Sequence, residues 1–187
     1  MIRIAISGKA NSGKNTVGKF ISGVMDAAYA VDYAFANPIK ELLLNMFPTA
    51  NRSELYGASK LRGNLIPGTN TTYRQVLLDL GKLGRSYSEN IWINKFEDDY
   101  NKHPSAELYL VTDLRFQNEF TALNNKQFIL IRVKRKESTV INDESETSLD
   151  EIPDRYFDHI IDNDQDIDHL RNVCFNIAMP IKNGIKE

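Results

Sequence analysis

The residues nearest the N-terminus have the types and the spacing of a phosphate-binding loop. Gly8 and Gly13 enclose four residues, and Lys14 follows directly. In such a loop, glycines let the backbone curl so that successive N–H groups point at phosphate oxygens. The helix that follows presents the positive end of its dipole to the same anion, and the lysine adds a full charge. The spacing therefore predicts a site for nucleotide phosphates, and residues 8–16 are called the phosphate loop below.

The segments on either side of the phosphate loop support this interpretation. Residues 2–7 predict a short apolar strand, and apolar side chains recur at helical spacing from Val17 to Met25. A strand, a glycine-rich turn and a helix are the order in which the motif binds phosphate. The alternative is an ordinary glycine-rich turn between a strand and a helix.

The residues after Lys14 depart from the commonest form of the motif. A Ser or Thr normally follows the lysine and reaches magnesium, but here Asn15 intervenes and Thr16 comes second. The Lys-x-Thr form is similar to that of nucleoside monophosphate kinases, which favours phosphoryl transfer to a small molecule. It leaves open which side chain touches the metal. We expect the donor phosphates to be bound by Gly8, Ser12, Gly13, Lys14, Asn15 and Thr16.

A second group of charged residues could take part in the same chemistry. Asp113 ends an apolar run at residues 108–112, and ligands bind at the carboxyl ends of strands in open α/β sheets. Its carboxylate could hold magnesium, directly or through water, or accept a proton from the phosphoryl acceptor. The alternative role is a helix N-cap. Thr16 and Asp113 are therefore the candidate metal ligands.

Arginines are the third signal, because a forked guanidinium group stabilises the charge of a transferring phosphoryl group. The candidates are Arg74, Arg85, Arg115, Arg132 and Arg135. Arg115 lies two residues past Asp113, whereas Arg132 and Arg135 open a polar segment, as the arginines of a lid would. The alternative for each arginine is a solvated surface charge.

The composition of the whole chain excludes several classes of function. The 187 residues are 42% apolar, enough for one domain, and a net charge of −2 gives no overall basic field for nucleic acid. The single cysteine, Cys174, excludes an internal disulfide and suits a reducing compartment. The sequence has no zinc-ligand spacing and no Gly-x-Ser-x-Gly motif. Without a signal peptide or a membrane-length apolar run, we expect a cytoplasmic protein that binds neither membranes nor nucleic acid.

Strand and helix patterns alternate along the chain, which predicts an α/β fold with a parallel sheet covered on both faces. Strands are predicted at residues 2–7, 30–35, 108–112, 127–133 and 159–162. Helices are predicted at 14–27, 37–47, 73–83, 91–96, 116–123 and 166–178. Asn37 would cap the second helix, and Thr71 or Thr72 the third. Residues 48–71 look irregular, and a loop of this length is usually functional or mobile.

Several of these segments together resemble the phage-type deoxynucleoside monophosphate kinases. The similar segments are Gly-x4-Gly-Lys-x-Thr at 8–16, Phe-Ala-Asn-Pro-Ile-Lys at 35–40, Arg-Gln-Val-Leu-Leu-Asp-Leu-Gly at 74–81 followed by Gly84, Arg85 and Trp92, Asp-Leu-Arg-Phe-Gln-Asn-Glu at 113–119, and Ser145-Glu146. Residues 161–164 resemble a loop on the base side of related kinases. The resemblance covers most of the chain, and the segment at 113–119 is more specific than the phosphate loop.

The resemblance implies a single P-loop kinase domain with a five-stranded parallel sheet, a monophosphate-binding insertion at about 37–100 and a lid at about 134–155. It implies transfer of the γ-phosphate of ATP, with Mg²⁺, to a deoxynucleoside monophosphate. The implied catalytic residues are Lys14, Asp113, Arg115, Arg132 and Arg135. The implied acceptor residues are Lys40, Arg74, Arg85, Trp92 and Glu146, and Asn163 would contact the adenine. A homodimer and a phage-encoded enzyme in the host cytoplasm are expectations at the level of the family.

Four positions depart from the family's pattern. Asp79 stands where Gln is expected, Gln117 where Pro is common and Asn37 where Asp is common, and Asp143 precedes the Ser-Glu pair in place of a histidine. These differences bear on which base is accepted, and they leave Lys14 and Arg115 unchanged.

Two other functions are compatible with the phosphate loop. One is a different P-loop small-molecule kinase, such as a dephospho-coenzyme A kinase, with the same donor and another acceptor. The other is a regulatory or assembly module that binds a nucleotide without transferring phosphate. The set of phosphate-directed charges, Lys14, Asp113 and the arginines, argues against a pure binder.

Overall fold

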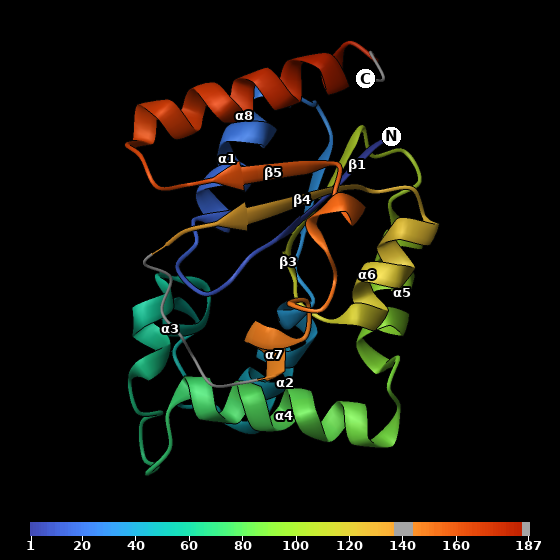
Figure 1. Ribbon diagram of the computed structural model, residues 1–187. Helices are drawn as coiled ribbons and strands as arrows, with labels where there is room; N and C mark the ends of the chain where they lie inside the picture. Colours follow the sequence, from blue (N-terminus) through green and yellow to red (C-terminus); the bar gives the residue numbers. More distant parts are fainter. Residues whose placement is uncertain (137–143, 185–187) are drawn as a thin grey trace. The chain divides into compact units, whose positions relative to one another are not determined.

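In the described part of the chain, five parallel strands form one sheet, in the order β2-β3-β1-β4-β5 (Figure 1). The strands are β1 (Ile2–Ser7), β2 (Ala30–Tyr33), β3 (Leu108–Leu114), β4 (Ile129–Lys134) and β5 (His159–Asp162). The computed structural model describes residues 1–136 and 144–184. Each neighbouring pair of strands is parallel. The predicted α/β fold with a five-stranded parallel sheet is therefore confirmed.

The chain divides into two compact units. Unit 1 comprises Met1–Ala34 and Tyr100–Glu187 and contains the whole sheet, whereas unit 2 comprises Phe35–Asp99. Each unit has an apolar core of its own. That unit 2 binds a nucleoside monophosphate stays a prediction.

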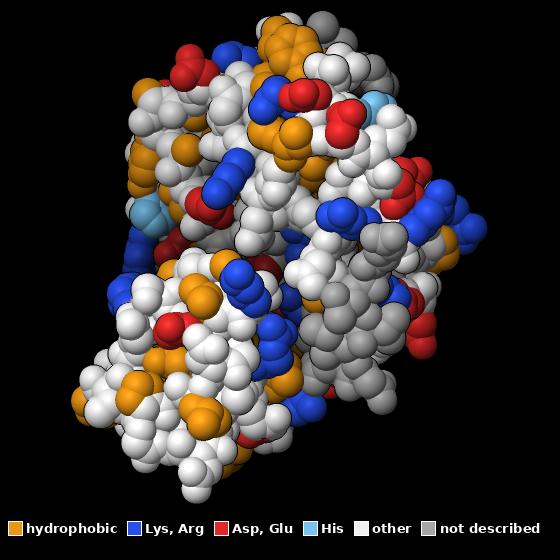
Figure 2. Space-filling model, turned by 90° about the vertical axis from the view of Figure 1, so that its left-hand side faces the viewer, with side chains coloured by type: hydrophobic (Ala, Val, Ile, Leu, Met, Phe, Trp, Pro, Cys, Tyr) orange, Lys and Arg blue, Asp and Glu red, His pale blue; other side chains and the backbone are white. Residues whose placement is uncertain are grey.

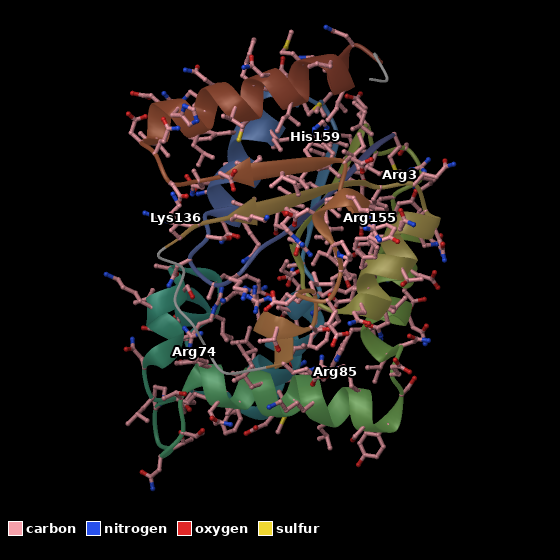
Figure 3. The ribbon with its side chains drawn as sticks, in the orientation of Figure 1. Arg3, Arg74, Arg85, Lys136, Arg155 and His159 are labelled. Carbon is pink, nitrogen blue, oxygen red and sulfur yellow. The ribbon has the colours of Figure 1, made fainter. Side chains whose placement is uncertain are left out.

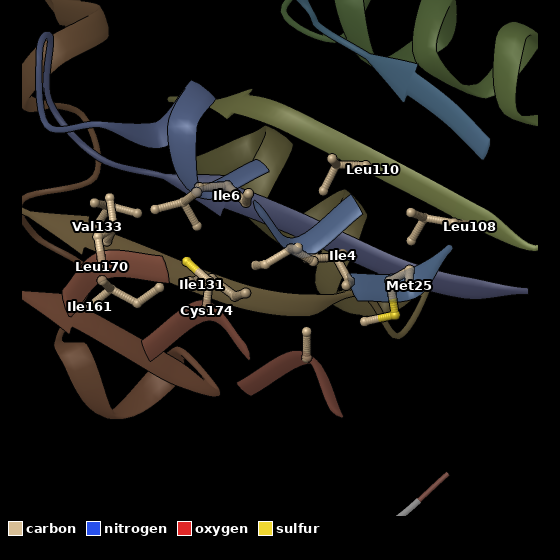
Figure 4. Packing of buried hydrophobic residues seen from close by; sticks show 13 residues of the cluster. Ile4, Ile6, Met25, Leu108, Leu110, Ile131, Val133, Ile161, Leu170 and Cys174 are labelled. Carbon is tan, nitrogen blue, oxygen red and sulfur yellow. The ribbon is translucent and has the colours of Figure 1, made fainter. Parts of the chain in front are cut away.

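Two helices cover one face of the sheet in unit 1. Helix α1 (Lys14–Met25) packs beside α8 (Ile167–Lys182), and both bury apolar side chains against alternate strand residues (Figure 4). Ile131 and Val133 of β4 belong to this core. Because side chains alternate along a strand, Arg132 points to the opposite face. Helix α6 (Gln117–Asn125) lies on that side of the sheet (Figure 1).

Unit 2 is helical, and its segment 48–71 is more regular than expected. Its elements are α2 (Ala36–Met46), α3 (Arg52–Tyr56), a 3₁₀ helix η1 (Ser59–Gly63), α4 (Tyr73–Tyr87) and the greater part of α5 (Ile91–Lys102). The Asn51 side chain accepts a hydrogen bond from the backbone N–H of Ser53, and Leu55 is fully buried. This cap and this anchor explain why α3 forms in a segment without a clear apolar period.

The predicted caps of α2 and α4 have different outcomes. Thr72 caps α4, because its side chain accepts a hydrogen bond from the backbone N–H of Gln75. The prediction that Asn37 caps α2 was wrong, since α2 begins at Ala36. Asn37 lies inside the first turn, where its side-chain oxygen accepts a hydrogen bond from Lys40 Nζ at 3.1 Å. The Asn37 side chain therefore accepts a hydrogen bond from a neighbouring side chain instead of capping the backbone of the helix.

The remaining elements lie between β4 and β5 in the sequence of unit 1. Helix α7 (Glu144–Thr147) and a 3₁₀ helix η2 (Asp154–Tyr156) fall in the segment predicted to be a lid. Residues 137–143 of that segment lie outside the described residues. Within the described chain, no helix is both long enough and apolar enough to cross a membrane.

Candidate phosphate-transfer site

The register of the sheet brings three strand ends together in unit 1. Ser7, the last residue of β1, pairs with Leu114 at the end of β3 and with Arg132 of β4. The phosphate loop starts after Ser7, and Arg115 starts the turn after β3. The carboxyl end of a parallel sheet is where ligands bind in this class of fold. The three segments with predicted phosphate chemistry therefore meet at one edge.

The phosphate loop has the curled backbone that its glycines predict. Gly8, Asn11 and Gly13 all have positive φ angles, of 150°, 61° and 100°. The Ser12 N–H donates to the Lys9 carbonyl at 3.1 Å, which closes the turn. A Cβ on Gly8 would collide with the Val133 carbonyl and lie 2.6 Å from Ser12 Oγ. The close approach of β4 and Ser12 therefore requires glycine at position 8, in addition to its backbone angle.

Lys14 is buried beneath the loop that it follows. Its Nζ donates to the Gly8 carbonyl and, at 2.7 Å, to the Lys9 carbonyl. Its neighbours differ in exposure, because Asn15 is exposed and Thr16 is half-buried. The lysine ammonium is thus held at the base of the loop by backbone oxygens.

A pocket of about 400 Å³ opens between the phosphate loop and the ends of β3 and β4. Its cationic side chains are Lys9, Arg115, Arg132, Lys134 and Arg135, and its acidic side chains are Asp150 and Asp154. Gly8 and Ser12 also line it. The structure therefore brings together five of the predicted site residues: Gly8, Ser12, Arg115, Arg132 and Arg135. In the described part of the chain, Lys14, Thr16 and Asp113 are not among the residues that line this pocket.

Residues 149–154 bind several of the pocket's cations. Asp150 pairs with Lys9 at 2.9 Å, and Asp154 pairs with Arg132 at 2.7 Å and with Lys134. Arg132 also donates to the Leu149 carbonyl at 2.8 Å. The hydrogen bonds from Lys134 and Arg132 lower the pKa of the Asp154 carboxyl. Acidic and basic side chains lie beside one another elsewhere on the surface too (Figure 2).

Sequence reasoning missed four of the charged residues that line the pocket: Lys9, Lys134, Asp150 and Asp154. Lys9 occupies a variable position of the motif, and Lys134 adjoins two arginines that were singled out. Asp150 and Asp154 lie in a segment with no apolar period, so only their pairing partners reveal them. For Lys9 and Lys134, position next to the motif residues was a usable signal.

Glu119 is a fifth residue that sequence reasoning did not single out. Its carboxylate is buried and accepts backbone hydrogen bonds from Arg115 at 2.9 Å and from Phe116 at 3.1 Å. Burial, and then the charge of Asp113, raise the pKa of Glu119 to about 8. Asp113 itself lies within β3 instead of after it. Glu119 therefore fixes the turn that carries Arg115 by two hydrogen bonds, and it lies close enough to Asp113 for the two carboxyl groups to interact electrostatically.

Asn163 contacts the phosphate loop directly. Its Nδ2 donates to the Ser12 carbonyl at 2.8 Å, and the residue is buried. A Cβ on Gly13 would collide with the same Nδ2 atom. That Asn163 contacts an adenine stays a prediction.

The predicted acceptor residues that the structure describes lie in unit 2. Lys40 is buried, with its Nζ 4.4 Å from the centre of the Tyr56 ring. Arg74 and Arg85 come from α4 (Figure 3), and Arg74 donates to the Ser59 carbonyl at 3.1 Å. Trp92 is buried and donates through Nε1 to the Gly81 carbonyl at 3.2 Å. The side chain of Glu146 lies outside the described part of the chain.

The residues of unit 1 have the chemistry to bind a nucleoside triphosphate and a Mg²⁺ ion. Ser12 Oγ is buried and, within the described chain, has no hydrogen-bond partner. The loop's close backbone packing and the surplus of cations suit a polyanion. The Thr16 hydroxyl and the Asp113 carboxylate supply oxygen atoms, which Mg²⁺ prefers. The donor set is therefore compatible with both groups.

A family model described as deoxynucleotide monophosphate kinase matches residues 3–84 of this chain. That range contains the phosphate loop and α2 and ends within α4. No curated protein matches the chain. The family's description indicates kinase activity on deoxynucleotide monophosphates, which is phosphotransfer. Over residues 3–84 this chain is therefore similar to the deoxynucleotide monophosphate kinase family, which confirms the resemblance inferred from its motifs.

Proposed function

We propose that this protein transfers the γ-phosphate of ATP to a deoxynucleoside monophosphate and releases the diphosphate and ADP. The observation that carries the proposal is the cation-lined pocket at the phosphate loop, where the ends of β1, β3 and β4 meet. The family match over residues 3–84 supports the class of acceptor.

The donor side of the reaction belongs to unit 1. Backbone N–H groups of the phosphate loop, with Ser12, Asn15 and Thr16, would bind the phosphates of ATP. Lys14, held at the base of the loop, would place its ammonium toward the β and γ phosphates. Thr16 and Asp113 would hold Mg²⁺, which when bound offsets phosphate charge. Asp113 would otherwise accept the proton of the attacking group.

The transferring group would be stabilised by arginines at the strand ends. Arg132 is already fixed by Asp154 and the Leu149 carbonyl, so it needs little reordering. Arg115 stands on the turn that Glu119 holds. Arg135, which also lines the pocket, would complete the set and exclude water that would otherwise hydrolyse ATP.

Four of the five residues that would bind the acceptor, all except Glu146, belong to unit 2. Lys40, Arg74 and Arg85 supply three cations for the monophosphate. Trp92 is buried, so its effect on acceptor binding would be indirect: it would fix α5 against α4, the helix that carries Arg74 and Arg85. Glu146 would hydrogen-bond the sugar of the acceptor.

A coupled assay for ADP release tests the proposed function. The acceptors are dGMP, dTMP, dCMP, dAMP, their ribonucleotide counterparts and dephospho-coenzyme A, each with ATP and Mg²⁺. We expect turnover with at least one deoxynucleoside monophosphate. Turnover with dephospho-coenzyme A alone would identify another kinase, and nucleotide binding without acceptor-dependent ADP release would identify a binding module.

Replacing Lys14 by alanine tests the donor site. Lys14→Ala removes the charge at the base of the loop, so we expect turnover to fall at least about a hundredfold. Circular dichroism should stay like that of the wild type. The control is Lys19→Ala, which removes an exposed lysine of the same helix and should leave kcat unchanged. Equal activity of both variants would contradict the assignment.

A further inference from the structure

We propose that Asn163 is a positioning residue for the phosphate loop: it holds the Ser12 carbonyl and thereby aims the Gly13 N–H at the bound phosphate. The proposal rests on the proposed function, because it concerns the donor site of that reaction. It assigns Asn163 a role that does not depend on the base of the nucleotide.

The hydrogen bond between Asn163 and the loop joins residues that lie far apart in the sequence. Asn163 Nδ2 donates to the Ser12 carbonyl at 2.8 Å, across a separation of 151 residues. Both Asn163 and Ser12 are buried, with relative exposures of 8% and 1%. A buried hydrogen bond is expensive to break, because each group would lose its partner without gaining water.

The position of Asn163 is fixed by the sheet. The residue follows β5 directly, where Asp162 pairs with Lys134 of β4. The Asn163 backbone N–H donates to the Lys134 carbonyl at 2.8 Å. The next residue, Asp164, accepts from the Lys136 N–H at 2.8 Å. A backbone hydrogen bond of Asn163 and a side-chain hydrogen bond of Asp164 therefore hold the segment that carries the Asn163 amide against the end of β4.

The planarity of the peptide bond turns this contact into an orienting device. The Ser12 carbonyl and the Gly13 N–H belong to the same trans peptide, so they point in opposite directions. When Asn163 draws the carbonyl to its side, the N–H must point away from Asn163. Among the described residues, no hydrogen bond engages this N–H, which leaves it available to a phosphate oxygen.

Gly13 shows that the contact is built into the loop. Its φ of 100° suits glycine, and a Cβ there would also collide with Asn163 Nδ2. Position 13 therefore needs glycine for two independent reasons, the backbone angle and the approach of the amide. The absence of a side chain at Gly13 is therefore what lets the Asn163 amide reach the loop.

Equilibrium binding tests the role, with inorganic tripolyphosphate and ATP as the two probes. The proteins are the wild type, Asn163→Ala, Asn163→Asp and, as a matched control, Asn125→Ala, which removes an exposed asparagine at the end of α6. We expect Asn163→Ala to weaken both probes by a similar factor, about tenfold, because the lost hydrogen bond lies on the loop. Asn163→Asp should weaken both probes further, since its carboxylate faces the Ser12 carbonyl without a donor.

The kinetic constants supply a readout that general loss of structure would not produce. We expect the KM for ATP to rise in both Asn163 variants while the KM for the deoxynucleotide acceptor stays unchanged. Asn163→Asp keeps the shape of the side chain, so it serves if Asn163→Ala fails to fold.

Three outcomes would overturn the inference. Weaker binding of ATP alone would show that Asn163 contacts the base. Unchanged binding of both probes would show that the loop needs no support from Asn163. A wild-type protein that bound neither probe would overturn the proposed function, and this inference with it.

Discussion

At the residue scale, carboxylates of residues 149–154 already pair three of the five cationic side chains of the pocket, those of Lys9, Arg132 and Lys134. The Lys9–Asp150 pair is about half exposed on both sides, so it contributes little to stability and can open at low cost. Arg132 is more buried and has two acceptors, the Asp154 carboxylate and the Leu149 carbonyl. A bound phosphate would therefore compete more easily for Lys9 than for Arg132, whose guanidinium stays in place.

Arg115 offers a direct test of the catalytic assignment. Arg115→Ala removes a half-buried guanidinium from the pocket. We expect it to reduce transition-state stabilisation by several kcal/mol, so that kcat/KM falls about a hundredfold or more. Steady-state kinetics measures the loss, with circular dichroism as the check on folding. Arg171→Ala, an exposed arginine of α8, should retain full activity. An Arg115→Ala enzyme with unchanged turnover would remove Arg115 from the site.

Glu119 should make stability depend on pH in an unusual direction. Its pKa is about 8 in the folded protein and 4.5 as the ordinary value, so the folded state holds a proton that the unfolded chain has released. The contribution of Glu119 to the free energy of unfolding therefore falls as pH rises from about 5 to about 8. Glu119→Gln removes this titration. As pH rises through the same range, the free energy of unfolding of the variant should therefore fall less than that of the wild type. Urea denaturation of metal-free protein across this range measures both, and parallel curves would contradict the prediction.

At the element scale, the pairing of α4 with α5 depends on one glycine and one tryptophan. A Cβ on Gly84 would collide with the Trp92 ring and lie 3.3 Å from Ile91 Cγ2. The indole cannot move away freely, because its Nε1 donates to the Gly81 carbonyl. The two helices thus approach closely where the side chain is absent, which positions the α4 residues Arg74 and Arg85.

Two glycine-to-alanine changes should have opposite effects on stability. Gly84→Ala should lower the free energy of unfolding by about 1–3 kcal/mol through overpacking against Trp92. Gly23→Ala, at an exposed position of α1 with open space around it, should raise it by about 0.5–1 kcal/mol through helix propensity. Chemical denaturation measures both. A stabilising Gly84→Ala would show that the α4–α5 contact is looser than described.

At the scale of the whole molecule, each unit contains an apolar cluster of its own. The cluster of unit 1 lies between the sheet and helices α1 and α8, and the cluster of unit 2 includes Leu43, Leu55 and Tyr73. Apolar contacts stabilise the elements that share them, so each core should govern the stability of its own unit. The residues proposed to bind the donor and the unit 2 residues proposed to bind the acceptor would then depend on different clusters.

Truncating one core should therefore loosen one unit more than the other. Leu43→Ala removes a fully buried side chain from unit 2, at a cost of about 2–5 kcal/mol. Hydrogen exchange should show the larger loss of protection in α2 and α4, and the smaller in β1 and β4. Ile21→Ala in unit 1 should show the reverse pattern. Equal losses throughout the chain would show that both units unfold as one.

The local patterns of the sequence predicted the elements well wherever a short stretch carried its own signal. The spacing of Gly8, Gly13 and Lys14 predicted a curled loop between a strand and a helix, and Thr72 capped α4 as expected. Helix α3 was missed, because its stability comes from an Asn51 cap and one buried leucine. A single anchor leaves no periodic pattern to detect.

By itself, the sequence determined the class of fold, the phosphate loop and the family resemblance, because these depend on residues close together in the chain. Only the tertiary structure decided that Asn163 supports Ser12, that Asp154 holds Arg132 and that Glu119 is buried beneath Arg115's turn. The Asn163 and Asp154 contacts follow from the register of the strands and the packing of distant segments. Neither composition nor spacing encodes which of several carboxylates or amides reaches a given partner, since that choice is made only when the chain folds.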